Sequence, residues 1–361
     1  MLEAMGGTVG LDIRVMGSNE GITGVPSYVL HLARYLVRRG DSVLFSDEPT
    51  VVLPCNVVRS VVKALPWQQF ALPMAATRAK IGIFHGPAFS LPMWGKFRKI
   101  VTIHDLAYVK NRDWMKDSVY TYLKRMVPMS LKVSEAIIVP TRQVKQDLLE
   151  AYPRLAKEES IFVIPMGSEF APDAVPLKTT AAYAWNRPYI LHVGTIEPRK
   201  NLETLIRAFS VIVHDKRFPH ALILAGAYGW KYDGVLAAIQ QSPSRDRIFR
   251  LGYVDGEELE RLHRGADLYV QPSFYEGFGM STLDAYCLGV PIVSTRTGWI
   301  SEISEDNIGW VTNPFDVSEM AEAIGRMLDA RPPKATTQGA EWSWERTMGD
   351  HERLYGQIAK W

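Results

Sequence analysis

The sequence predicts an α/β protein built from two domains, each with a parallel sheet, and three observations support this. Apolar runs of strand length alternate with helical segments along almost all of the 361 residues, which favours parallel sheets covered by helices on both faces. Residues 165–188 interrupt the alternation with prolines and small residues, as expected of a linker between domains. Several predicted strands also run directly into loops that contain glycine, histidine or charged residues.

The first domain opens with a strand, a glycine-containing loop and a helix. The strand is predicted at 9–15, and residues 25–39 have helical periodicity. This order is typical of a nucleotide-binding half. The loop between them, 17–24, is not a Gly-x-Gly-x-x-Gly fingerprint, so an ordinary strand-to-helix turn is the alternative. Further strands are predicted at 42–45, 81–84, 100–103 and 136–139.

Two of these strands end in histidines, His85 and His104. Ligands of open α/β sheets bind beyond the carboxyl ends of the strands, so both side chains stand where chemistry is expected. His104 is the better candidate because Asp105 follows it, although adjacent side chains on a strand point apart. For His85 a structural role is the expectation. The sequence has no Ser/His/Asp order and no metal-ligand cluster, so neither a hydrolase nor a metalloenzyme is indicated.

The second domain begins with a strand at 189–193, a loop at 194–201 and a helix at 202–213. Arg199 and Lys200 in this loop can bind phosphate oxygens, Arg through its planar fork and Lys as a compact charge. An exposed basic turn is the alternative. Further strands are predicted at 221–225, 248–251, 268–270 and 291–294, and helices at 234–241, 257–264, 281–288 and 342–361.

The most informative stretch is a glycine-rich loop that leads into a short helix. Gly277 and Gly279 let the backbone approach a ligand because they carry no β-carbon. Ser281 is expected to cap the helix, whose N-terminus would offer N–H groups to a phosphate. Glu276 would repel phosphate unless it binds hydroxyl groups, which suggests a sugar nucleotide. Asp284 either binds hydroxyls too or closes a capping box with Ser281.

Composition is ordinary for a globular protein, with 47% hydrophobic and 22% charged residues. The formal net charge is +2, yet residues 1–175 hold 21 Lys and Arg against 16 Asp and Glu. A basic first half could face an acidic acceptor or an anionic membrane, or could simply be solvated. The aromatic and basic segment 115–133 adds a membrane-surface hypothesis, for which packing on its own sheet is the preferred alternative.

The expected location is the cytoplasm, with peripheral contact at the inner face of the membrane as a hypothesis. Two distant cysteines, Cys55 and Cys287, suggest no disulfide framework. The sequence shows no signal peptide and no apolar run of membrane-spanning length. No nucleic-acid partner is expected.

Five short motifs occur in a fixed order: Gly21-Ile22-Thr23-Gly24, His104-Asp105, Glu197-Pro198-Arg199-Lys200-Asn201, Leu251-Gly252-Tyr253-Val254 and Glu276-Gly277-Phe278-Gly279. Together they resemble the retaining glycosyltransferases of family 4, which have the GT-B fold. The resemblance covers nearly the whole chain and implies two Rossmann-like domains facing across a cleft. Residues 1–172 would form the acceptor side and 173–342 the nucleotide-sugar side, with 343–361 crossing back to the first domain.

The resemblance also implies roles for individual residues. Glu276 would bind hydroxyls of the donor sugar, Arg199 and Lys200 would hold the diphosphate and stabilise its charge as it leaves, and His104 would lie near the sugar. The loop of Gly24 would approach phosphate or acceptor. The remaining donor-binding residues implied are Thr195, Tyr253, Val254, Gly277, Phe278, Gly279, Met280, Ser281 and Asp284.

The chain departs from the family at three positions. Asp284 stands where glutamate is usual, Ala88 where related mannosyltransferases often carry asparagine, and Ser301 where proline is common. Aspartate is one methylene shorter than glutamate, which favours the capping-box alternative over the ribose contact that the resemblance implies for this position.

The expected activity is transfer of a hexosyl group, mannose-like as in GDP-mannose, from a nucleotide diphosphate sugar to a saccharide or lipid-linked hydroxyl. Retention at the anomeric carbon and a place in surface polysaccharide or glycoconjugate synthesis follow from the resemblance alone. No cofactor and no obligatory metal are expected, in line with the absence of an Asp-x-Asp motif. The alternatives are a sugar-nucleotide epimerase, a phosphorylase on the same fold and a non-catalytic sugar-nucleotide binder.

Overall fold

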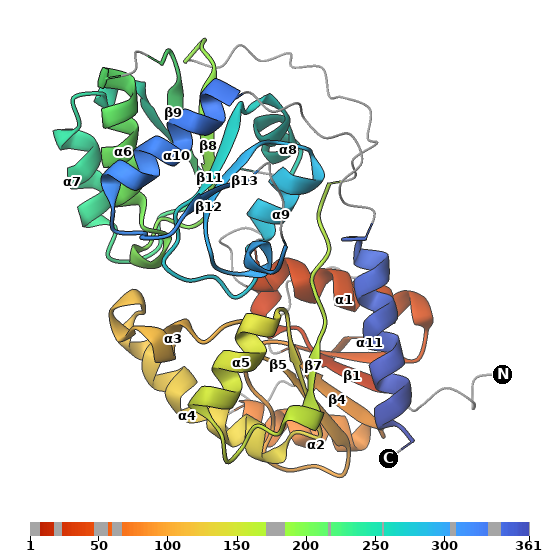
Figure 1. Ribbon diagram of the computed structural model, residues 1–361. Coiled ribbons are helices and arrows are strands. Elements are labelled where there is room, and N and C mark those ends of the chain that lie inside the picture. Colours follow the sequence, from red (N-terminus) through yellow and green to blue (C-terminus); the bar gives the residue numbers. More distant parts are fainter. Residues whose placement is uncertain are drawn as a thin grey trace. The chain divides into compact units, whose positions relative to one another are not determined.

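The structure is a computed structural model that divides into two compact units (Figure 1). Met1–Arg112, Asp117–Gly167 and Trp344–Trp361 form the first unit, and Asp113–Lys116 with Ser168–Ser343 form the second. The structure describes residues 8–17, 24–46, 57–59, 67–170, 185–215, 218–254, 256–303, 308–330 and 341–360. Most of the predicted linker, the Gly21–Thr23 part of the first motif and Cys55 therefore lie outside the described residues.

Each unit is built on a parallel sheet, as the sequence predicts. The strands of the first are β1 Val9–Asp12, β2 Ser42–Ser46, β3 Val57–Arg59, β4 Ile83–Gly86, β5 Arg98–Thr102, β6 Ala136–Val139 and β7 Ile161–Val163. Those of the second are β8 Tyr189–Val193, β9 Ala221–Ala225, β10 Ile248–Gly252, β11 Leu268–Gln271, β12 Ile292–Thr295 and β13 Ile308–Val311. Within the described ranges the orders are β3-β2-β1-β4-β5-β6-β7 and β10-β9-β8-β11-β12-β13.

Helices cover both sheets. They are α1 Val25–Arg39, α2 Leu72–Arg78, α3 Ala107–Lys110, α4 Asp117–Val133, α5 Arg142–Ala151, α6 Leu202–Asp215, α7 Asp233–Gln241, α8 Gly256–Gly265, α9 Met280–Cys287, α10 Val317–Ala330 and α11 Trp344–Ile358. In the second unit, α6, α7 and α10 lie on one face of the sheet and α8 and α9 on the other (Figure 1). This is why β8, β9, β11 and β12 are buried along almost all of their length.

The segment that suggested a membrane-surface helix packs on its own sheet. In α4 the side chains of Leu123, Val127 and Leu131 are buried at helical spacing, and α4 contacts β5. The preferred alternative is therefore confirmed for this face. Val119 and Tyr122 lie on the exposed side of the same helix.

The C-terminal helix α11 belongs to the first unit, as the resemblance implies. Two of its buried side chains bond to the core of that unit. The Tyr28 hydroxyl is 2.7 Å from His351 Nε2, and the Tyr355 hydroxyl is 2.7 Å from His85 Nδ1. His85 also bonds to Thr102 through Nε2 at 2.8 Å, so the structural role expected for His85 is confirmed.

The second sheet changes direction between β8 and β11. From β8 the chain proceeds outward to β9 and β10, then returns to the other side of β8 to form β11, β12 and β13. All pairs are parallel, so the carboxyl ends of the strands lie at one edge. A ligand site is expected beyond the strand ends at such a reversal. The loops after β8 and β11 begin there side by side.

Candidate active site

The helix α9 begins directly after the glycine-rich loop, but its N-cap is Gly279 rather than Ser281. Gly279 has φ 94°, in the left-handed region that favours glycine, and its carbonyl accepts from the N–H groups of Thr282 and Leu283. The glycine itself turns the chain into the helix, so the predicted Ser281 cap is wrong. Within the described ranges, the N–H groups of Met280 and Ser281 have no acceptor and are available to an anion.

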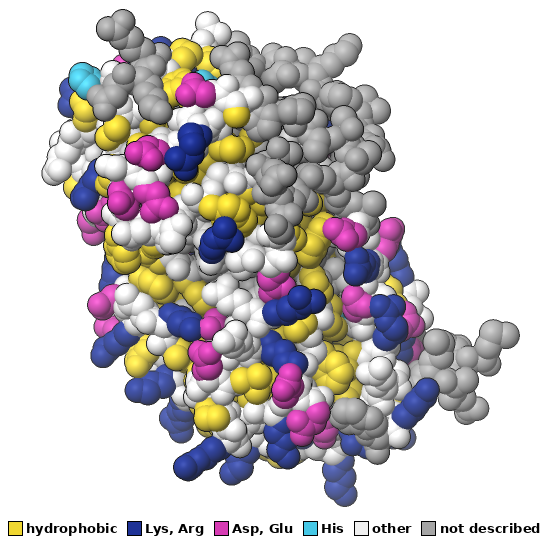
Figure 2. Space-filling view, viewed as in Figure 1, with side chains coloured by type: hydrophobic (Ala, Val, Ile, Leu, Met, Phe, Trp, Pro, Cys, Tyr) yellow, Lys and Arg dark blue, Asp and Glu magenta, His cyan; other side chains and the backbone are white. Residues whose placement is uncertain are grey.

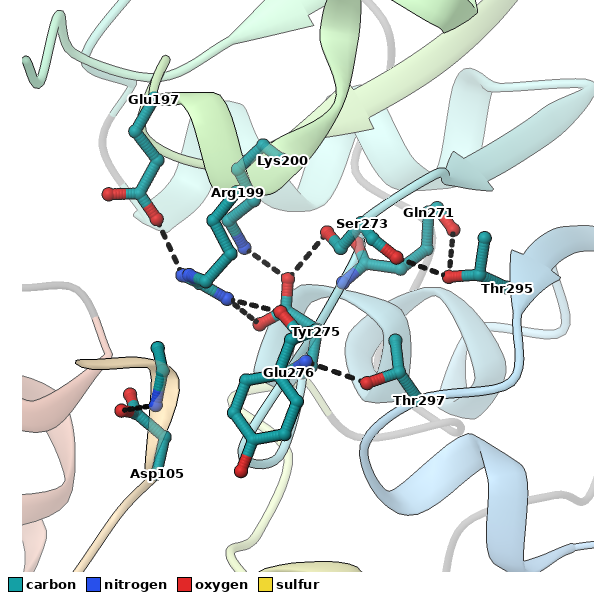
Figure 3. A network of polar contacts seen from close by, with 12 residues as sticks. Asp105, Glu197, Arg199, Lys200, Gln271, Ser273, Tyr275, Glu276, Thr295 and Thr297 are labelled. Atoms are coloured by element: carbon teal, nitrogen blue, oxygen red, sulfur yellow. Dashed lines mark hydrogen bonds and ion pairs between the residues drawn. The ribbon is translucent and has the colours of Figure 1, made fainter. Parts of the chain in front are cut away.

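Glu276 joins Arg199 and Lys200 in one network where the second sheet reverses (Figure 3). Arg199 Nη1 lies 2.8 Å from Glu276 Oε2, and Lys200 Nζ lies 2.7 Å from Oε1. The Ser273 hydroxyl donates to Oε1 at 2.6 Å, and the Glu276 N–H donates to Thr297 Oγ1 at 2.7 Å. Three of the four residues predicted as catalytic thus meet in the second unit.

The two cations determine the protonation state of Glu276. Burial alone would raise the pKa of this carboxyl, but Arg199, Lys200 and the hydrogen bond from Ser273 outweigh it and hold the pKa well below its usual range. Glu276 is therefore ionised at neutral pH and can only accept hydrogen bonds. Glu197 differs: it pairs with Arg199 Nη2 at 2.6 Å, yet burial raises its pKa.

The loop that carries the two cations is a single tight turn over Pro198–Lys200. Asn201 ends the turn with φ 54°, and its amide donates to Pro272 O at 3.0 Å and to Pro314 O at 2.7 Å. The Arg199 carbonyl accepts from the Phe274 N–H at 2.9 Å. These bonds fix the turn to the loops that follow β11 and β13.

The other donor-binding residues expected in the second unit lie in loops at the same edge of its sheet. Thr195 follows β8, and Tyr253 and Val254 follow β10, with 47% of Tyr253 exposed. Gly277 and Phe278 precede α9, and the Phe278 ring lies 6.4 Å from that of Trp299 between centroids. Their contacts with a donor stay a prediction.

Asp284 does not close a capping box with Ser281. Its Oδ1 accepts from the Ser168 hydroxyl at 2.7 Å and from the Glu169 N–H at 3.0 Å. The capping-box alternative is therefore wrong, because the carboxylate binds the segment that enters the second unit. Burial raises the pKa of Asp284 to about 7, although both hydrogen bonds act in the opposite direction.

In the first unit, His104 follows β5 and is buried. Its Nε2 lies 2.7 Å from Pro87 O, and a carbonyl only accepts, so Nε2 carries the proton and Nδ1 is an acceptor. Nδ1 has no partner in the described part of the chain. Burial lowers the pKa of His104 to about 4, which keeps the imidazole neutral. Asp105 turns instead to the N–H of Ala107, at 3.1 Å (Figure 3).

Gly24 is the exposed N-cap of α1. It opens the first helix of the first unit, as the order of strand, loop and helix predicts.

The predicted site residues did not include Glu197, Asn201, Ser273 or Thr297, which bond to the three central side chains or hold their loops in place. Glu197 and Asn201 belong to the same short motif as Arg199 and Lys200, and this neighbourhood in the sequence could have identified them as site residues. Ser273 and Thr297 carried no signal, because a hydroxyl side chain after a strand is common in any loop.

The described residues include neither a cluster of metal ligands nor a membrane-spanning helix. No group of three or more His, Cys, Asp or Glu side chains there is placed to hold a metal ion. None of the helices within the described ranges is long and apolar enough to cross a bilayer.

The chain is similar to known proteins in sequence and in structure. O-antigen chain mannosyltransferase B of Escherichia coli is 28% identical over 273 residues, which cover 73% of this chain and 71% of that protein. Sucrose-phosphate synthase from Thermosynechococcus elongatus superposes with a TM-score of 0.76 at 22% identity, over 97% of this chain and 98% of that one. Anabaena Alr3699/HepE, solved in complex with UDP and glucose, gives a TM-score of 0.69 at 13% identity, over 98% and 95%.

Two family models match successive parts of the chain. Residues 22–169 match the model described as Glycosyltransferase Family 4, and residues 181–340 match Glycosyl transferases group 1. The two matches correspond to the two Rossmann-like units, and the second contains Arg199, Lys200, Glu276 and Asp284. The chain therefore belongs to the family 4 glycosyltransferases with the GT-B fold.

Proposed function

We propose that the protein transfers a hexosyl group from a nucleotide diphosphate sugar to a hydroxyl of a saccharide or lipid-linked acceptor, with retention at the anomeric carbon. The observation that carries this proposal is the junction of Arg199, Lys200 and Glu276 where the second sheet reverses. Two cations bound to Glu276, in the loop that leads into α9, suit a diphosphate, as does the N-terminus of that helix. An ionised carboxylate suits the hydroxyls of a sugar.

The cations would act on the leaving group. As the bond between the anomeric carbon and the diphosphate oxygen breaks, that oxygen gains negative charge, which Arg199, Lys200 and the N–H groups of Met280 and Ser281 would balance. Glu276 would accept hydrogen bonds from the sugar. In this proposal the protein supplies the positive charge, and no metal ion is obligatory.

His104 would contribute from the first unit. Its Nδ1 is a buried acceptor with no partner within the described ranges, and a substrate hydroxyl would supply the missing donor. The neutral imidazole suits this role because a protonated ring has no acceptor. No observation favours an epimerase, a phosphorylase or a non-catalytic binder over the transferase.

The donor is the first property to test, with mannose favoured by the similarity to the Escherichia coli mannosyltransferase. We expect one member of a panel of GDP-, UDP- and dTDP-sugars, GDP-mannose first, to raise the melting temperature, and that donor to be consumed only when an acceptor is added. Transfer should continue in EDTA, and NMR of the product should show the anomeric configuration of the donor.

Other outcomes would identify the alternatives. Conversion of the donor without an acceptor would indicate an epimerase, and a requirement for inorganic phosphate would indicate a phosphorylase. Tight donor binding with no turnover would indicate a non-catalytic binder. Activity lost in EDTA and restored by Mg²⁺ would contradict metal independence.

The first unit also carries an aromatic patch, formed by Phe70, Trp94 and Tyr122, which are exposed by 43–46%. Trp94 Nε1 donates to Gln69 O at 2.6 Å and the Tyr122 hydroxyl to Gln68 Oε1 at 3.1 Å, so both rings adjoin the turn that carries Phe70. On the face drawn in Figure 2, hydrophobic side chains lie among both basic and acidic ones. We propose that this patch touches an anionic membrane surface.

Vesicle co-sedimentation tests this contact. We expect the protein to sediment with vesicles containing phosphatidylglycerol and not with phosphatidylcholine alone, and the bound fraction to fall with added salt. Trp94→Ala should lower the bound fraction, whereas Phe315→Ala, at a site 71% exposed in the second unit, should not. Binding that is indifferent to anionic lipid would contradict the proposal.

A further inference from the structure

A buried histidine, His192, links the two strands between which the second sheet changes direction, β8 and β11. His192 is the fourth residue of β8 and is fully buried. Its Nδ1 is 2.9 Å from Val270 O on the neighbouring strand β11. Because a carbonyl only accepts, Nδ1 carries the proton and Nε2 presents a lone pair. Nε2 is buried and has no hydrogen-bond partner within the described ranges.

The unpartnered nitrogen borders the same small space as Lys200. A β-carbon placed on Gly194 would lie 3.4 Å from His192 Nε2, 3.4 Å from Lys200 Nζ and 3.2 Å from Lys200 Cε. Gly194 has no β-carbon, so this space stays open between the imidazole and the ammonium. A buried acceptor without a donor is costly, so a donor is expected at some stage of the reaction.

A ligand atom is a poor candidate for that donor, because Nε2 is closed to solvent. The Lys200 ammonium borders the space and has three N–H groups, one of which is engaged by Glu276 Oε1 at 2.7 Å. The pKa of His192 supports an acceptor role, since burial and the charge of Lys200 lower it to about 4 and keep the ring neutral.

We propose that His192 is a positioning residue for Lys200. When a nucleotide diphosphate sugar binds, the sugar hydroxyls donate to Glu276 and replace Lys200 there. The Lys200 ammonium then donates one hydrogen bond to His192 Nε2 and another to a diphosphate oxygen. This inference rests on the proposed function, because it assigns the second position of a cation that the proposed function uses. No bond to a carbon or phosphorus atom changes in this step.

Two substitutions distinguish the roles of the two ring nitrogens of His192. His192→Asn places an amide N–H near Nδ1, which keeps the bond to Val270 O and removes the acceptor. His192→Gln places its amide oxygen near Nε2, which keeps the acceptor and removes the bond to Val270 O. A purely structural histidine would therefore favour the asparagine variant, and a positioning histidine the glutamine variant.

The test is titration calorimetry of the full chain with the GDP-, UDP- and dTDP-sugars of the panel, without acceptor. For whichever nucleotide sugar the unsubstituted protein binds, we expect about 10-fold weaker binding for His192→Asn, equivalent to about 1.4 kcal/mol, and less than about 3-fold for His192→Gln. In a Lys200→Gln background, His192→Asn should change the affinity less than about 2-fold, because the partner is gone. Thermal unfolding of each variant checks the fold.

The outcomes distinguish this inference from the proposed function. If the unsubstituted protein binds none of the nucleotide sugars, the proposed function is at fault and this inference falls with it. If it binds one of them and His192→Asn binds equally well, or His192→Gln is the weaker of the two variants, the positioning role alone is overturned.

Discussion

Glu276→Gln is expected to lower kcat/KM for transfer about 100-fold. The amide cannot balance Arg199 and Lys200, which lie 2.8 and 2.7 Å from the carboxylate oxygens and are only 15% and 12% exposed. It also presents one acceptor where the carboxylate has two, so sugar hydroxyls would be held less well. Removing one partner from a buried ion pair costs about 3 kcal/mol, so the second unit should also be destabilised.

A matched control separates these effects from a general change of charge. Glu322→Gln removes an exposed carboxylate of α10 that pairs with Arg326 at 3.5 Å, and its effect should stay within about 0.5 kcal/mol. Steady-state kinetics with the donor found in the panel, together with urea unfolding, provide the measurements. A Glu276→Gln enzyme that transfers at the normal rate would remove Glu276 from the proposed mechanism.

Asp284→Asn is expected to remove a pH dependence of stability. In the folded protein burial raises the pKa of Asp284 to about 7, against an ordinary value of 3.8. The unfolded chain therefore loses this proton at lower pH than the folded chain. The contribution to stability is fully present below pH 3.8 and is lost as the pH rises to about 7, by about 4 kcal/mol in all.

The asparagine amide stays neutral at every pH, and its oxygen can still accept from Ser168 and Glu169. Urea unfolding at pH 5 and pH 8 should therefore show the unsubstituted protein losing about 3 kcal/mol more than Asp284→Asn between the two pH values. Comparing the variants cancels the titration of other groups. An identical pH dependence for the two proteins would show that Asp284 is already ionised at pH 5.

The same variant bears on the ribose contact that the resemblance implies. A fall in affinity for GDP or UDP at pH 8 would support that contact. An affinity that stays constant while the pH dependence of stability disappears would leave Asp284 as an anchor for the segment around Ser168.

The sequence predicted the interior of each sheet better than its edges. The bounds 136–139, 189–193 and 221–225 agree with β6, β8 and β9, because these strands are buried on both faces and appear as continuous apolar runs. The strands β3, β7 and β13 were not predicted, and all three lie at sheet edges. An edge strand pairs on one side only and needs no such run. The helix α10 was also missed.

His85 and His104 show how far the sequence could predict the candidate site. His85 and His104 both follow apolar strand residues, and the sequence favours His104 only through its neighbour Asp105. The structure separates the two by partners: His85 bonds to Thr102 and Tyr355, whereas His104 Nδ1 has no partner within the described ranges. Asp105, which prompted the preference, bonds to the Ala107 N–H and not to His104.

By itself, the sequence predicted the two α/β domains and singled out Arg199, Lys200 and Glu276 as candidate site residues, because alternation, spacing and motif order can be read along a chain. The return of the last helix to the first domain was implied by the family resemblance. Only the tertiary structure decided which side chains meet. Glu276 follows Lys200 by 76 residues and Asp284 follows Ser168 by 116, and a one-dimensional pattern contains no distance between such positions. The first contact arises because parallel strands bring the loops after β8 and β11 to one edge, where Glu276 meets two cations. In the second, the Ser168 hydroxyl and the Glu169 N–H donate to the Asp284 carboxylate, which therefore binds a distant segment instead of its own helix.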